Sequence, residues 1–141
     1  MKKNNSGFSL VELIIVIAIM AVLIGVLAPQ FIKYVEKSKE NKDITNLDSC
    51  VTAVQTYYAD KDFPDGGVTI TAAKGSALAS SDNNVALKDA GAANSIVTGD
   101  WTTAIKATIS STGEVKYEGV AKYIQANSTG TGFEAPSSSN G

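Results

Sequence analysis

One acidic residue lies inside an apolar segment near the N-terminus. In the 21 residues from Phe8 to Ala28, only Ser9 and Glu12 are polar. A helix of that length is about 31 Å long, close to the hydrocarbon thickness of a bilayer. An ionisable group there costs about 2.5 to 3.5 kcal/mol on insertion scales, so it normally has a partner and a task. The chain has no lysine or arginine between Phe8 and Gln30. Glu12 therefore either reaches the head groups from the helix start or pairs with a cation from elsewhere.

The remaining composition argues against an enzyme. The 141 residues include no histidine and one cysteine, Cys50, so no set of nucleophile, base and orienting group can be assembled and no cofactor is expected. Cys50 is predicted to be a small buried core residue. The net charge is −2 and all basic residues are lysine, which argues against a nucleic-acid partner. Asp60, Asp62 and Asp65 lack the EF-hand spacing, so no metal site is predicted.

The N-terminal segment permits three kinds of membrane targeting. Val26-Leu27-Ala28 resembles a secretory cleavage site, but cleavage there would have to break the bond to Pro29. An uncleaved anchor is the second possibility. The third is a cut after Gly7, before the apolar segment, which retains the helix in the mature protein. A glycine suits that position because it lets the backbone extend in a protease cleft.

The sequence Gly7-Phe8-Ser9-Leu10-Val11-Glu12, followed by the apolar segment, resembles the class III signal of type IV prepilins and pseudopilins. The resemblance covers residues 1 to about 35 and is weak beyond residue 60. It implies that a prepilin peptidase and methyltransferase cuts between Gly7 and Phe8 on the cytoplasmic side and methylates the Phe8 amine. It also implies that Glu12 meets the Phe8 amine of a neighbouring subunit and sets the axial register during assembly.

Gly25 and Pro29 predict a weak point in the helix. Pro29 has no N–H to donate to the carbonyl of Gly25, and its ring crowds that carbonyl. The pair has two compatible interpretations, a bend toward a globular domain or the membrane boundary. The resemblance implies local unwinding near such a proline in assembled filaments.

The rest of the chain predicts an α+β, pilin-like fold, in which a long N-terminal helix packs on a small antiparallel β-sheet. The expected divisions are a cleaved leader (1–7), a transmembrane and filament-core helix (8–29), an amphipathic helix (30–62), a β-rich globular domain (63–126) and a flexible tail (127–141). Apolar residues recur every three or four positions in the amphipathic helix and predict a packing stripe: Ile44, Leu47, Val51, Val54 and Tyr58. Four charged residues fall off this stripe: Lys37, Glu40, Lys42 and Asp48.

Alternating residues at 104–109 and 114–118, separated by Ser111-Thr112-Gly113, predict an antiparallel hairpin. Its apolar face would cover the helix stripe and comprises Ile105, Ala107, Ile109, Val115 and Tyr117. Trp101 is expected at the edge of this interface. Phe63-Pro64-Asp65-Gly66-Gly67 predicts the turn that follows the helix.

These patterns favour a structural subunit of a type IV pilus or a related filament. Its expected partners are other copies of the chain, the prepilin peptidase, an assembly platform and membrane lipid. The precursor would cross the cytoplasmic membrane once, with its C-terminus outside, before entering an extracellular or envelope-spanning filament. One alternative is a major pseudopilin of a type II secretion or competence system. The lack of a cysteine pair favours either this alternative or a Gram-positive pilin. The other is a monomeric membrane-anchored extracytoplasmic binding module, which would have no use for Glu12.

Overall fold

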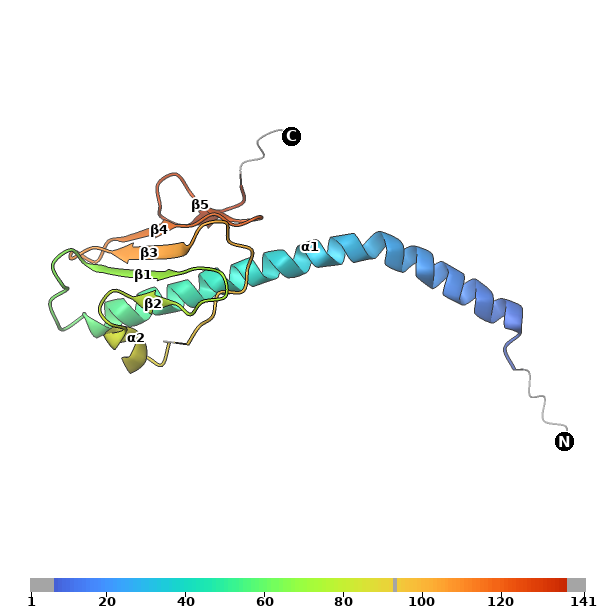
Figure 1. The fold of residues 1–141 in the computed structure, drawn as a ribbon, viewed down its shortest axis with the longest axis horizontal. Coiled ribbons are helices and arrows are strands. Elements are labelled where there is room, and N and C mark those ends of the chain that lie inside the picture. The colour runs from blue at the N-terminus through green and yellow to red at the C-terminus, as the bar shows by residue number, and fades with distance from the viewer. Residues whose placement is uncertain (1–6, 93, 137–141) are drawn as a thin grey trace. The chain divides into compact units, whose positions relative to one another are not determined.

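The computed structural model describes residues 7–92 and 94–136. The chain divides into two compact units, Met1–Val35 and Glu36–Gly141. Helix α1 (Leu10–Tyr57) supplies the described secondary structure of the first unit and continues into the second (Figure 1). We describe each unit separately.

In the first unit, α1 is apolar on all sides. It is the one helix in the described part of the chain that is long and apolar enough to cross a membrane. Its large apolar side chains are exposed, from Leu10 (75%) through Ile17 (56%) to Leu27 (60%). Pro29 lies inside the helix, and the helical assignment continues through it. The predicted weak point at Gly25 and Pro29 therefore stays a prediction.

The second unit combines the C-terminal part of α1 with two small sheets (Figure 1). The larger sheet has the strand order β2-β1-β3-β4, and all of its neighbouring strands are antiparallel. Its strands are β1 (Val68–Ala72), β2 (Ala79–Ser80), β3 (Ile105–Ile109) and β4 (Val115–Glu118). The short helix α2 (Val85–Asp89) follows β2. The predicted α+β fold is confirmed.

The core lies between α1 and the larger sheet. Leu47, Val51 and Val54 of α1 are buried, and Ile44 and Tyr58 pack against them partly buried. On the sheet side, alternate residues of β1 and β3 point inward because successive side chains of a strand face opposite sides. They are Val68, Ile70, Ile105, Ala107 and Ile109.

The predicted hairpin is confirmed as β3 and β4. Ala107 pairs with Tyr117, and Ile109 pairs with Val115. The helix ends at Tyr57, five residues before the expected boundary at 62, and Gly67 lies in the turn before β1 with φ 78°. A Cβ at Gly67 would lie 2.0 Å from the carbonyl oxygen of Ile109, so the chain needs glycine at that point.

The segment expected to be a flexible tail contains a short strand. β5 (Gln125–Ala126) pairs with β6 (Phe133–Glu134), and the ring of Phe133 packs against Trp101 and Tyr117 with centroid distances of 5.7 Å and 5.5 Å. One large apolar side chain therefore anchors a segment that has no periodicity of its own. The same segment covers the outer edge of β4, where the Tyr117 N–H donates to the Gly130 carbonyl at 2.7 Å. Residues 137–141 lie outside the described part of the chain.

Candidate assembly site

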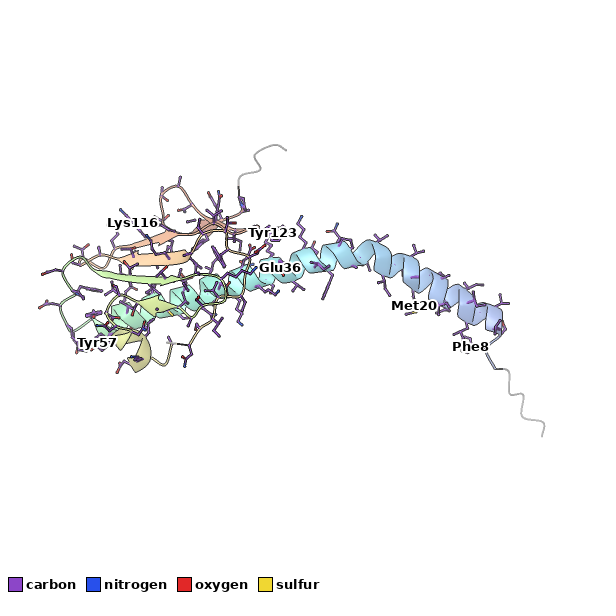
Figure 2. The ribbon with its side chains drawn as sticks, viewed as in Figure 1. Phe8, Met20, Glu36, Tyr57, Lys116 and Tyr123 are labelled. Atoms are coloured by element: carbon purple, nitrogen blue, oxygen red, sulfur yellow. The ribbon has the colours of Figure 1, made fainter. Side chains whose placement is uncertain are left out.

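The predicted processing and assembly residues lie at the start of α1. Gly7, Phe8 and Ser9 precede the helix, and the Phe8 side chain is 87% exposed. Figure 2 shows Phe8 at the beginning of the helix, with Met20 farther along it. A Cβ at Gly7 would meet no atom of the chain within 4 Å, so Gly7 is not required by a packed contact within this molecule.

Ser9 and Glu12 form a reciprocal pair of hydrogen bonds at the helix N-terminus. The Ser9 N–H donates to Glu12 Oε2 at 2.8 Å, and the Glu12 N–H donates to Ser9 Oγ at 3.2 Å. This arrangement is a capping box, which satisfies two backbone N–H groups that have no partner in the helix. The negative charge also lies at the positive end of the helix dipole. The Ser-x-x-Glu spacing in the sequence is the signature of this capping box.

The capping box places the Glu12 carboxylate one residue from the Gly7–Phe8 peptide bond. Its hydrogen bond goes to the N–H of Ser9, and Phe8 precedes Ser9. A cut at this bond would create an amine on Phe8, close to the carboxylate of the same chain. The local geometry therefore allows Glu12 to meet an amine on its own chain as well as one on a neighbour.

Comparison with known proteins bears on this N-terminal segment. Residues 2–28 match the family described as the prokaryotic N-terminal methylation motif. The type IV major pilin protein PilA of Myxococcus xanthus is 41% identical over 59 residues, which are 42% of this chain and 27% of that relative. The type IV major fimbrial protein FimA of Dichelobacter nodosus is 33% identical over 60 residues, 43% of this chain and 38% of the relative.

The N-terminal segment of the chain is thus similar to those of type IV pilins and fimbrial proteins. Fimbrial protein EcpC of Eikenella corrodens is similar in the same segment, with 36% identity over 61 residues, 43% of this chain and 40% of the relative. The chain thus spans between about a quarter and two fifths of the length of these curated relatives. No solved structure matches the chain.

The predicted packing stripe lies in the globular unit, away from the predicted processing residues in the sequence. Leu47, Val51 and Val54 are buried against the sheet, with Ile44 and Tyr58 at the margins. Cys50 is buried and free beside them, and burial raises the pKa of its thiol. Trp101 is 6% exposed and belongs to the same core.

Two buried carboxylates on α1 were not predicted. Asp43 is fully buried and accepts hydrogen bonds from the N–H groups of Thr98 (2.9 Å) and Gly99 (2.6 Å) and from Nε1 of Trp101 (2.8 Å). Because the acceptor is charged, such bonds are stronger than neutral ones. Asp43 therefore fixes the loop 98–101 to the helix.

The second carboxylate is Glu40, which the apolar periodicity placed off the packing stripe. That interpretation is wrong, because Glu40 is also fully buried. Its Oε2 atom accepts a hydrogen bond of 3.0 Å from the N–H of Tyr123, which lies beside the helix (Figure 2). Glu40 and Asp43 are one helical turn apart and hold two separate loops on α1.

Within the described residues, no group of three or more His, Cys, Asp or Glu side chains is arranged to hold a metal ion. The groups available for chemistry in the N-terminal segment are the Gly7–Phe8 peptide bond, the Glu12 carboxylate and the apolar surface of α1.

Proposed function

We propose that this chain is a structural subunit of a type IV pilus or a related filament. The observation that carries the proposal is the N-terminal segment, in which Gly7, Phe8 and Glu12 stand in the pilin pattern ahead of an apolar helix. The names of the relatives, a major pilin and fimbrial proteins, support the same conclusion.

The first step of the proposal is processing. A prepilin peptidase and methyltransferase cuts between Gly7 and Phe8 and methylates the new Phe8 amine. The exposed, non-helical backbone of residues 7–9 supports this step, since an extended segment fits a protease cleft. The apolar helix stays in the product, first as a single membrane span of a precursor whose C-terminus is outside.

The second step is assembly by helix packing, with other copies of the chain and an assembly platform as partners. Large apolar side chains cover the helix between Leu10 and Val35, and burying them against other helices is favourable once the subunit leaves lipid. The weakened hydrogen bonding at Gly25 and Pro29 lets the helix adjust locally during this packing.

The third step sets the axial register. Glu12 leaves the capping box, or shares it, and pairs with the Phe8 amine of the adjacent subunit. A misplaced subunit would leave a buried charge without a partner, at a cost of about 3 to 5 kcal/mol. The monomeric anchored module would gain nothing from this pairing.

Two measurements test the proposal. Mass spectrometry of the native protein should find an N-terminus at Phe8 that carries a methyl group, whereas an N-terminus at Pro29 or an intact Met1 would contradict the processing step. Glu12→Ala should be cleaved normally but form no filaments, while Glu114→Gln, which removes an exposed acid elsewhere, should assemble as the wild type does. Normal filaments from Glu12→Ala would refute the register step.

A further inference from the structure

Glu40 has an incomplete set of hydrogen bonds. Its Oε2 atom accepts from Tyr123, but its Oε1 atom is buried without a hydrogen-bond partner among the described residues. A buried carboxylate with an unpaired oxygen is costly when ionised, because water no longer solvates the charge. A neutral carboxyl avoids most of that cost.

The groups that face Glu40 make its surroundings acidic. Glu36 precedes it by one turn on α1, Asp43 follows it, and Asp100 faces it from the loop 98–101. The charge of Asp100 is partly met by Lys74, at 2.8 Å, and that of Glu36 by Lys39, also at 2.8 Å. From the opposite loop, backbone N–H groups of Lys122 and Tyr123 favour the ionised form. Burial is the largest effect, and with Asp100 and Glu36 it raises the pKa of Glu40 above the usual value.

The packing keeps Glu40 in this position. A Cβ on Gly99 would lie 2.9 Å from Glu40 Cγ, 3.0 Å from Glu40 Cα and 2.8 Å from Asp43 Oδ2. The loop 98–101 therefore closes directly over the side chain. Glu40 cannot reach water unless this loop or the segment 122–123 moves away from α1.

We propose that Glu40 is a proton-binding site that couples the closure of the loops 98–101 and 122–123 over α1 to pH. Proton uptake removes an unpaired buried charge and tightens the globular unit. Proton loss restores that charge and favours opening of the loops. The proposal is independent of the filament function, because every contact it uses lies within the globular unit.

The sign of the effect follows from linkage. The folded chain holds the Glu40 proton more tightly than the unfolded chain does, so folding is favoured as pH falls through the raised pKa of the folded state. This gain in folding free energy is complete once the pH has fallen to about the pKa of an unperturbed glutamate. The stability of the globular unit should therefore rise as the pH falls from 7.5 toward the pKa of an unperturbed glutamate.

The test is thermal unfolding of the full chain in detergent micelles, followed by the fluorescence of Trp101. This is the only tryptophan of the chain, and it donates to Asp43 beside Glu40. We expect the wild-type Tm to rise by a few degrees as the pH falls from 7.5 to about 4.5. Glu40→Gln should remove the rise and keep the acceptor for Tyr123, and the control Glu114→Gln should behave as the wild type does. A wild-type Tm that is flat or falls over this range would overturn the proposal, as would an unchanged rise in Glu40→Gln.

A direct titration covers the case in which Glu40→Gln does not fold. The ¹³C shift of the Glu40 carboxyl in the wild-type chain should titrate above the usual pH range of a glutamate. A midpoint within the usual glutamate range would overturn the proposal without any variant.

Discussion

The indole Nε1 of Trp101 donates a hydrogen bond of 2.8 Å to Oδ2 of Asp43. The two residues are 58 positions apart in the sequence, and both are buried. This bond joins the loop before β3 to the C-terminal part of α1. It also makes the fluorescence of one side chain a reporter of the helix–loop contact.

Asp43→Asn should destabilise the globular unit by about 3 kcal/mol. The amide keeps one acceptor oxygen but turns an NH₂ group toward the donors of Thr98, Gly99 and Trp101, which leaves buried N–H groups unpaired. Urea unfolding followed by Trp101 emission measures the loss. Asp62→Asn, on the exposed loop after α1, should change stability by less than about 0.5 kcal/mol. Equal midpoints for the two variants would argue against the role of Asp43.

Gly99→Ala should cost about 1 to 3 kcal/mol, because the added methyl group would overlap with the backbone of Glu40 and the carboxylate of Asp43. Gly132→Ala is the matched control, since a Cβ there would meet no atom within 4 Å. Differential scanning calorimetry of the two variants separates a packing effect from a general glycine effect. If the Gly99→Ala variant is as stable as the Gly132→Ala variant, the loop 98–101 can move away from α1 without cost.

Phe133→Ala should lower the stability of the globular unit by about 2 kcal/mol. The ring is partly buried between Trp101 and Tyr117, so the cost should fall below that of a fully buried phenylalanine. A lower urea midpoint with an unchanged m-value is the expected result. Val120→Ala, at an exposed position, serves as the control. If both variants have the urea midpoint of the wild type, the segment after β5 does not belong to the folded unit.

Stability should fall at alkaline pH through Tyr117. Burial first, and then the hydrogen bond and charge of Asp48, raise the pKa of Tyr117 to about 12. Between about pH 10 and 12 the unfolded chain loses this proton while the folded chain keeps it, so unfolding is favoured as pH rises. The Tm of Tyr117→Phe should fall less steeply than that of the wild type over this range. Tyr34→Phe, which removes an exposed tyrosine, should keep the wild-type slope.

Ser9→Ala should loosen the first turn of α1 by about 1 kcal/mol, because the Glu12 N–H loses its acceptor. Amide hydrogen exchange at Glu12, measured by NMR in micelles, should become about fivefold faster. Ser9→Thr retains a hydroxyl and should exchange at the wild-type rate. Equal rates in Ser9→Ala and Ser9→Thr would mean that the capping box does not persist in micelles.

Much of the globular fold could be predicted because its signals are local. Alternation and a turn sequence are enough to place β3 and β4, and a spacing of three and four residues places Leu47, Val51 and Val54 on one face of α1. The N-terminal segment was recognisable for the same reason, since its motif is contiguous.

The errors have tertiary causes. Glu40 and Asp43 lie four residues before Ile44 and Leu47, on the buried face of α1, but the loops that cover them are about 55 to 83 positions away in the sequence. A charged side chain in the sequence gives no sign that such loops will bury it. The strands β5 and β6 are two residues each, too short for any alternation, and the contacts of Phe133 fix their position. The Ser9–Glu12 capping box is different, because its four-residue signature was present and was not considered.

The edges of the larger sheet affect how closely spaced copies of this chain can pair with one another. At one border β2 is two residues long, and at the other Gly130 accepts the hydrogen bond that the Tyr117 N–H of β4 would otherwise offer to a foreign strand. Short or occupied borders of this kind give an incoming strand little to pair with. The two edges of the larger sheet therefore offer neighbouring copies little template for strand exchange or amyloid-like stacking.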